Sequence, residues 1–201
     1  MHLGVDFDNT IVRYDALFHR VGVERGLVPP DLSVSKSEVR NYLREIGRED
    51  DWTEMQGYVY GARMSEAAPF PGVLDGLRTC RDRGIQVSVI SHKTRYPYRG
   101  ERYDLHQAAL AWLEQQGFFD PARIGLTRER AFFELTKQAK LERIGQCGCT
   151  HFIDDLPEFL LEPDFPPGVR RLLFDPNDHY AEAAAYRRYA DWPTIVTALT
   201  A

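Results

Sequence analysis

The chain has few cysteines, no long apolar run and no excess of basic residues. Its 201 residues include only Cys80, Cys147 and Cys149. Three thiols cannot all pair, and a chain of this length can bury a core without cross-links, so we expect a reducing, cytoplasmic setting. No apolar stretch approaches the ~20 residues that a membrane-spanning helix needs, and the N-terminus does not resemble a signal peptide. We therefore expect a soluble protein that does not associate with membranes.

The charge balance is mildly acidic, with 25 lysines and arginines against 30 aspartates and glutamates, a net charge of −5 and a pI near 5.7. A nucleic-acid-binding protein normally carries a basic face, so we expect no nucleic-acid partner. The first apolar segment is not followed by a glycine-rich turn, which argues against a nucleotide-dependent dehydrogenase. The proportions of hydrophobic (43%) and charged (27%) residues are those of a globular protein, and the length suits one core domain with an appendage.

Short apolar segments bounded by turn residues alternate with segments of helical spacing. This alternation predicts parallel βαβ units and an α/β fold, with a doubly wound, Rossmann-like parallel sheet. The strands are predicted at Leu3–Phe7, Ile85–Ile90, Arg123–Leu126, His151–Ile153 and Arg171–Phe174. Helices are predicted at Val73–Arg83, Asp104–Gln116, Ala131–Ile144 and Ala181–Arg188, with glycines where several of them end.

One stretch, residues 13–68, interrupts the alternation. It has helical spacing and many charges but no convincing strand, and Ser37–Ile46 and Thr53–Met64 are its clearest helices. The run Pro69-Phe70-Pro71-Gly72 marks the return to the alternating pattern. We therefore predict a core made of residues 1–12 and 69–201, with a small helical insertion at 13–68.

Two pairs of acidic residues follow predicted strands. Asp6 and Asp8 end the first strand, and Asp154 and Asp155 end the strand at His151–Ile153. The carboxyl ends of neighbouring parallel strands meet at one edge of a sheet, so both pairs are expected in one crevice. Carboxylates held close together are costly without a cation, and Mg²⁺ prefers oxygen ligands. Asp6, Asp8, Asp154 and Asp155 are therefore the predicted metal site.

Other polar residues near the strand ends suit the binding of phosphate. Ser91 follows the strand at Ile85–Ile90 and offers a hydroxyl group, and either Lys137 or Lys140 could supply a positive charge near Asp154. An arginine- and tyrosine-rich segment at 94–103 comes directly after Ser91-His92-Lys93. Loops that follow the end of a strand often carry binding residues. The predicted substrate contacts are Thr10, His92, Lys93 and Arg95.

The segment Cys147-Gly148-Cys149-Thr150-His151 offers two thiols and an imidazole. A structural zinc site normally has a fourth ligand and wider cysteine spacing. We interpret this segment as a loop that leads into a strand.

Taken in order, these residues resemble the signature of the haloacid dehalogenase superfamily. Asp6-Phe7-Asp8-Asn9-Thr10 is similar to its first motif, Ser91 to its second, Lys140 or Lys137 to its third and Asp154-Asp155 to its acidic fourth. The resemblance covers the whole chain, and the helical insertion is similar to the superfamily's helical cap. One departure is that neither lysine is followed by proline. We favour Lys140, since it lies closer to the strand at His151–Ile153.

The resemblance implies a role for each residue. Asp6 would be the nucleophile that takes up the phosphoryl group, and Asp8 the general acid and base, with its backbone carbonyl on Mg²⁺. Asp154 would bind the metal directly and Asp155 through water, while Ser91 and the lysine would hold the transferred oxygens. Dehalogenating members need no acid at the position of Asp8, so its presence implies phosphate chemistry.

The resulting hypothesis is a Mg²⁺-dependent phosphatase that acts on a phosphate ester of a small metabolite. Two alternatives remain open, namely a phosphotransferase or phosphomutase that uses the same aspartyl-phosphate, and a non-catalytic binding protein on this fold. The sequence indicates neither the particular substrate nor the oligomeric state.

Overall fold

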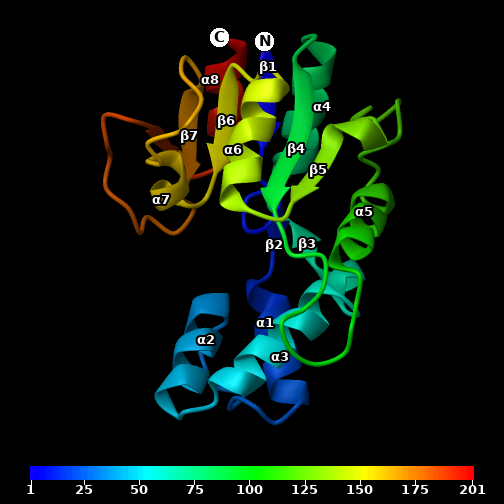
Figure 1. Ribbon diagram of the computed structural model, residues 1–201, viewed down its shortest axis with the longest axis vertical. Coiled ribbons are helices and arrows are strands. Elements are labelled where there is room, and N and C mark those ends of the chain that lie inside the picture. The colour runs from blue at the N-terminus through cyan, green and yellow to red at the C-terminus, as the bar shows by residue number, and fades with distance from the viewer. The chain divides into compact units, whose positions relative to one another are not determined.

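The computed structural model describes residues 1–201, which form two compact units (Figure 1). The core unit consists of residues 1–12, 69–93 and 116–201, and the helical unit consists of 13–68 and 94–115. The sequence predicts that only residues 13–68 lie outside the core. In the structure, residues 94–115 also belong to the helical unit, together with 13–68. One reason is the buried side chain of Trp112, whose Nε1 donates a hydrogen bond to the carbonyl oxygen of Ala67 over 2.8 Å.

A six-stranded, wholly parallel sheet forms the centre of the core unit, in the order β5-β4-β1-β6-β7-β8. This arrangement confirms the predicted α/β fold with a parallel, Rossmann-like sheet. The strands are β1 (His2–Val5), β4 (Gln86–His92), β5 (Ala131–Glu134), β6 (His151–Asp154), β7 (Arg170–Phe174) and β8 (Arg187–Tyr189).

Later strands of the chain are added on both sides of β1, and this arrangement positions the acidic residues. The chain first continues through β4 to the edge strand β5, and then returns to β6 on the other side of β1 before reaching β7 and β8. The strand order therefore reverses at β1, which is where α/β sheets place their ligands. As a result, the carboxyl ends of β4, β1 and β6 lie next to one another.

Four α-helices cover the sheet of the core unit, with α6 and α7 in front of it and α4 and α8 behind it (Figure 1). On the front, Phe152 of β6 and Leu173 of β7 are buried in one apolar cluster with Ile144 of α6 and Phe159 of α7. Burial of this apolar face is the main force that holds helices and sheet together. The helices are α4 (Val73–Asp82), α6 (Lys137–Gln146), α7 (Pro157–Leu160) and α8 (Trp192–Thr200), and a short 3₁₀ helix spans Arg128–Arg130.

Three of the predicted elements are wrong in type or position. Arg123–Leu126 is not a strand, because Gly125 has a φ of +70° and bends the chain. Its place in the sheet is taken by β5 (Ala131–Glu134). These residues were predicted to start the helix Ala131–Ile144, but the helix starts only at Lys137. No helix forms at Ala181–Arg188, since its last two residues begin β8.

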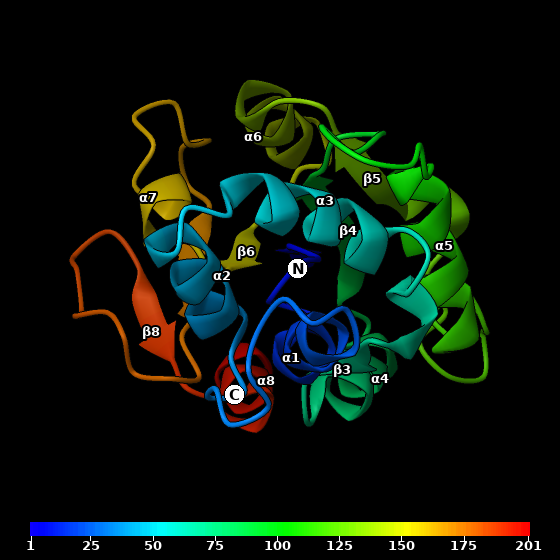
Figure 2. The same ribbon diagram turned by 90° about the horizontal axis from the view of Figure 1, so that it is seen from below.

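The helical unit contains α1 (Asp15–Glu24), α2 (Lys36–Glu45), α3 (Glu49–Tyr60), a 3₁₀ helix at Met64–Glu66 and α5 (Leu105–Gln115). Helices α1, α2 and α3 lie side by side (Figure 2). Aromatic rings fill the space between α1 and α3, with the centroids of Phe18 and Trp52 5.0 Å apart and those of Phe18 and Tyr60 5.6 Å apart. Where the chain passes between the units, β2 (Val12–Arg13) pairs with β3 (Ala68–Pro69). No helix of the protein is both long enough and apolar enough to cross a membrane.

Candidate active site

The loop after β1 positions the first acid pair. The backbone N–H of Asp6 donates to the carbonyl oxygen of Ile153 over 2.9 Å, so Asp6 still follows the sheet. The chain then turns, with Asn9 at a φ of +58°, a left-handed conformation that asparagine tolerates better than most residues. The N–H groups of Ile11 and Val12 both donate to the carbonyl oxygen of Phe7 and close the turn.

Asp6 is buried and tightly held. Its Oδ1 accepts hydrogen bonds from Ser91 Oγ over 2.9 Å and from Lys140 Nζ over 2.6 Å. Ser91 belongs to β4, which pairs with β1, so the sheet itself brings the hydroxyl group to this carboxylate. Because both donors bind Oδ1, Oδ2 is the oxygen left for another reaction partner.

Lys140, rather than Lys137, is the lysine that reaches the acids. It lies on the buried face of α6, and its Nζ binds Asp154 Oδ2 over 2.6 Å as well as Asp6. Its ammonium group also lies 4.1 Å from the ring centroid of Phe159, a cation–π contact. Lys137 is exposed, and its nearest carboxylate oxygen, that of Glu162, is 3.9 Å away.

Burial and the neighbouring charges perturb this cluster in opposite directions. Burial raises the pKa of Asp6 to about 7, because Asp154 adds to the effect and Lys140 offsets only part of it. Burial by itself would lower the pKa of Lys140, but Asp154 and Asp6 outweigh it and raise that pKa above its ordinary value. The ammonium group therefore stays charged, while the carboxylate of Asp6 bears an electrostatic cost that a further cation would relieve.

Three carboxylates are close enough to share a cation. Oxygens of Asp6, Asp154 and Asp155 all lie within 4.8 Å of one another. Asp154 is fixed by the N–H of Leu156, which donates to its Oδ1 over 3.0 Å, and Asp155 accepts from Thr10 Oγ1 over 3.3 Å. An all-oxygen donor set of this charge fits Mg²⁺, a hard cation. Asp8 was predicted to bind the metal through its backbone carbonyl, and its side chain does not belong to this group of carboxylates.

Asp8 instead forms an ion pair with Lys93. The Nζ of Lys93 lies 3.0 and 2.7 Å from the two carboxylate oxygens of Asp8, and its side chain is only 3% exposed. The backbone N–H of Lys93 donates to the carbonyl oxygen of Glu134 over 2.8 Å, which anchors the lysine at the end of β4. Lys93 was predicted to contact substrate, and in the structure its ammonium group contacts the carboxylate of Asp8.

The other predicted substrate contacts are placed differently from one another. Thr10 is buried, and besides its bond to Asp155 its carbonyl oxygen accepts from Trp192 Nε1 over 3.1 Å, which fits a supporting role. His92 is exposed at the end of β4. Arg95 belongs to the helical unit, where its Nε lies 3.1 Å from Asp104 Oδ2.

Comparison with known proteins gives a clear result for the fold. No protein-family model and no curated protein sequence matches the chain. A dehalogenase of known structure superposes with a TM-score of 0.58 at 11% identity, covering 100% of this chain and 97% of its own. A HAD family hydrolase from Deinococcus radiodurans, with bound phosphate and sodium, has a TM-score of 0.58 at 17% identity and covers 98% and 94%. A HAD-hydrolase from Bacillus subtilis bound to magnesium has a TM-score of 0.56 at 14% identity and covers 100% and 98%.

The chain has the fold of the haloacid dehalogenase superfamily hydrolases. The resemblance inferred from the four motifs is therefore confirmed at the level of the fold. These relatives include a dehalogenase and hydrolases, so the chemistry has to be argued from the side chains of this chain.

Two features of this candidate site are not predicted from the sequence. The first is the ion pair between Lys93 and Asp8, which depends on how the turn after β1 directs Asp8. The second is Phe159, whose ring lies beneath the ammonium group of Lys140. The sequence does contain an indirect signal for Phe159. Pro157, shortly after the acidic strand end, indicates the start of the helix that carries Phe159.

Proposed function

We propose that the protein is a Mg²⁺-dependent phosphatase that hydrolyses a phosphate monoester of a small metabolite through a phosphorylated Asp6. The observation that carries this proposal is Asp8, an acid two residues after Asp6, whose two oxygens are both held by the buried ammonium group of Lys93. A residue that passes protons between substrate and water has to be oriented, and this pair provides the orientation. The bound phosphate of the hydrolase from Deinococcus radiodurans is consistent with phosphate chemistry on this fold.

The metal would be held by Asp6, Asp154 and Asp155. Their clustered oxygens and the raised pKa of Asp6 support a cation at this position. When bound, Mg²⁺ supplies positive charge against the oxygens of the transferred phosphoryl group. Lys140 contributes a second positive charge from the protein itself.

In the first half of the reaction, Asp6 Oδ2 attacks phosphorus, and the bond from phosphorus to the ester oxygen breaks. Ser91 and Lys140 hold Oδ1, which turns Oδ2 toward the substrate. Asp8 donates a proton to the departing oxygen, so an alcohol leaves and a phosphorylated Asp6 remains. Fixed donors near the transferred group act without the reorganisation that water would need.

In the second half, Asp8 accepts a proton from a water molecule, whose oxygen attacks phosphorus. The bond between phosphorus and Asp6 breaks, which releases inorganic phosphate and restores the carboxylate. Lys93, whose Nζ contacts both oxygens of Asp8, keeps the Asp8 carboxylate in place during this step.

The proposal is tested by assaying the purified protein with p-nitrophenyl phosphate, whose leaving group needs little help from an acid, with and without Mg²⁺. We expect Mg²⁺-dependent release of phosphate that Asp6→Asn abolishes, since an amide has the same shape but cannot attack phosphorus. A panel of phosphorylated metabolites would then define the substrate. Retention of a tenth of the activity by Asp6→Asn, or chloride release from a chlorinated acid without phosphate release, would contradict the proposal.

The metal assignment has a separate test. Asp154→Asn removes one negative charge from the proposed ligands, so the Mg²⁺ concentration for half-maximal activity should rise by about tenfold or more. An unchanged Mg²⁺ dependence would place the metal elsewhere.

A phosphotransferase is distinguished by adding alcohol acceptors, which would then receive phosphate at the expense of hydrolysis. The cytoplasmic location stays a prediction, and the three cysteines are free thiols.

A further inference from the structure

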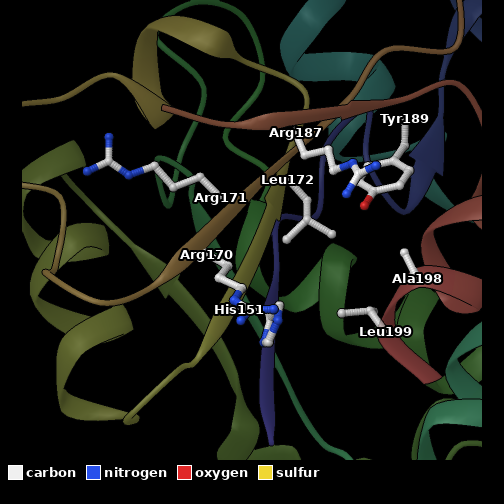
Figure 3. Close-up of a pocket in the computed structure, with 8 residues that line it drawn as sticks. All are labelled: His151, Arg170, Arg171, Leu172, Arg187, Tyr189, Ala198 and Leu199. Carbon is white, nitrogen blue, oxygen red and sulfur yellow. The ribbon is translucent and has the colours of Figure 1, made fainter. Parts of the chain in front are cut away.

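A pocket of about 180 Å³ lies at the edge of the sheet where β6, β7 and β8 begin (Figure 3). The proposed catalytic residues lie at the opposite edge, because parallel strands all end on the same side. On β6, His151 of the pocket and Asp154 of the site are three residues apart, roughly 10 Å along a strand. The pocket is therefore separate from the site described above.

The register of the strands explains which side chains line the pocket. His151 pairs with Arg170, and Leu172 pairs with Arg187, so these four residues lie on one face of the sheet. Tyr189, two residues after Arg187, shares that face, because side chains along a strand alternate. Arg171, between Arg170 and Leu172 on β7, and Ala198 and Leu199 of α8 complete the lining.

The lining contains basic residues but no carboxylate. The exposed guanidinium groups of Arg170 and Arg187 form no ion pair, whereas many other arginines of this acidic protein do. His151 adds a ring nitrogen, and burial together with the nearby charge of Arg170 lowers the pKa of His151. Two unpaired guanidinium groups beside a concave surface create a positive potential that favours an anion.

Arg171 shows what a structural arginine looks like on the same strand. It lies on the other face, and its guanidinium group points away from Arg170 and Arg187 (Figure 3). Its Nη1 donates to the carbonyl oxygen of Leu160 over 2.6 Å, and its Cζ lies 4.4 Å from the ring centroid of Phe165. Arg171 is thus engaged by the protein itself, and Arg170 and Arg187 are not.

We infer that this pocket binds the phosphate group of a small molecule between Arg170 and Arg187. Guanidinium groups bind phosphate through paired, charge-assisted hydrogen bonds. Leu172, Leu199 and the ring of Tyr189 offer an apolar surface beside these groups, which suits a ligand with a small organic substituent. Inorganic phosphate carries the same recognised group, so the experiment uses both kinds of ligand.

The test is a titration of the ¹⁵N-labelled full-length protein with inorganic phosphate and with phenylphosphonate, which has no hydrolysable ester bond. Chemical-shift changes at Leu172, Arg187 and Tyr189 report on the pocket, and those at Asp8 and Asn9 report on the proposed catalytic site. We expect saturable changes at both places. Tighter binding of phenylphosphonate at the pocket assigns an organic phosphate as the ligand, and equal binding assigns free phosphate.

Matched variants separate the pocket from a general effect of charge. Arg170→Gln with Arg187→Gln should weaken binding at the pocket by about tenfold or more, because each charge-assisted hydrogen bond contributes substantially, and leave binding at Asp8 unchanged. Arg40→Gln with Arg78→Gln removes the same charge from surface sites and should change neither. Arg187→Lys keeps the charge but loses the paired geometry, and should give an intermediate affinity. Changes confined to the catalytic residues, or equal weakening in the control pair, would overturn the inference.

Discussion

Lys140 shows how a single side chain is recruited to the proposed site. Its helix α6 is capped by Thr136, whose hydroxyl accepts from the N–H of Ala139 over 3.0 Å. Residues three positions apart on a helix differ by about 60° in direction, so Lys137 and Lys140 face different surroundings. The ammonium group of Lys140 is shared by Asp6 and Asp154, and it balances part of their charge.

The first prediction compares the two lysines. Lys140→Ala should reduce kcat/KM by orders of magnitude, because several kcal/mol of stabilisation of the transferred charge would be lost, whereas Lys137→Ala should be nearly silent. Steady-state kinetics with Mg²⁺ measure this difference. Thermal unfolding serves as the control, since Lys140→Ala also removes the positive charge that Asp6 and Asp154 share in the interior. Equal effects of the two substitutions on kcat/KM would remove Lys140 from the mechanism.

Much of the candidate site is visible in the sequence at this scale, but its pairings are not. Acids at the ends of apolar segments predict where Asp6 and Asp154 lie, because strand ends of a parallel sheet share an edge. The partner of Asp8 depends on the turn at Asn9, whose left-handed conformation the residue type permits but does not require. The sequence therefore predicts the members of the cluster better than their contacts.

At the scale of elements, the arginine- and tyrosine-rich segment is part of the helical unit and packs on α3. Gly57 of α3 has no side chain, and a Cβ there would lie 2.6 Å from Cβ of Pro97. Arg102 lies 4.0 Å from the ring centroid of Tyr96, and Arg95 pairs with Asp104. These contacts fix a segment that composition alone would describe as a polar loop.

The second prediction concerns this packing. Gly57→Ala should push the segment away from α3 and destabilise the helical unit by about 1–3 kcal/mol, the usual range for overpacking. Limited digestion with trypsin measures the change, since Arg99 and Arg102 are cleavage sites within the segment. Gly145→Ala is a matched control in α6, where a Cβ would meet nothing closer than 3.7 Å. If trypsin cleaved both variants at the wild-type rate, the close approach at Gly57 would have no structural role.

The wrongly predicted elements share a physical cause. Short apolar runs such as Ile124 to Leu126 satisfy a strand pattern, yet a buried turn needs apolar residues too, and Gly125 supplies the bend. The run Ala131-Phe132-Phe133-Glu134 fits a helix by composition. In the structure it pairs with β4, and the ring centroids of Phe133 and Phe7 lie 5.4 Å apart. Tertiary pairing overrides local propensity at such edge strands.

At the scale of the whole molecule, the charges gathered at one sheet edge link folding to pH and to the metal. Without a cation, Asp6 has a pKa of about 7 in the folded protein, against 3.8 for an unperturbed aspartate. Between these two values the unfolded chain has lost a proton that the folded protein retains. Stability must therefore fall as the pH rises through this range, by at most ~1.4 kcal/mol per pH unit from this group, and level off above about pH 7.

The third prediction is that Asp6→Asn removes this penalty. Thermal unfolding in the presence of EDTA should show the Tm of the variant exceeding that of the wild type by a margin that grows between about pH 5 and pH 7. For a protein of this size, about 2–4 °C of Tm corresponds to 1 kcal/mol, so the margin should grow by several degrees. Other titrating groups are shared by the two proteins and cancel in the comparison. Parallel Tm curves for the two proteins would mean that Asp6 is not held at an electrostatic cost.

The last prediction follows from the same balance with Mg²⁺ present. A cation favours the ionised form of Asp6, so it must displace a proton below about pH 7 but not above it. The rise in Tm produced by a fixed Mg²⁺ concentration should therefore be small at about pH 5, increase with pH, and become constant above about pH 7. Asp6→Asn should flatten this dependence, because the amide has no proton to displace. Any remaining binding of Mg²⁺ to Asp154 and Asp155 would give a smaller, pH-independent rise in Tm.

Calorimetric scans in buffers matched for ionic strength make the measurement, with Na⁺ at equal ionic strength as the control for screening. A Mg²⁺ effect of the same size and pH dependence in both proteins would show that the cation binds without Asp6, and would require a metal site made of other carboxylates.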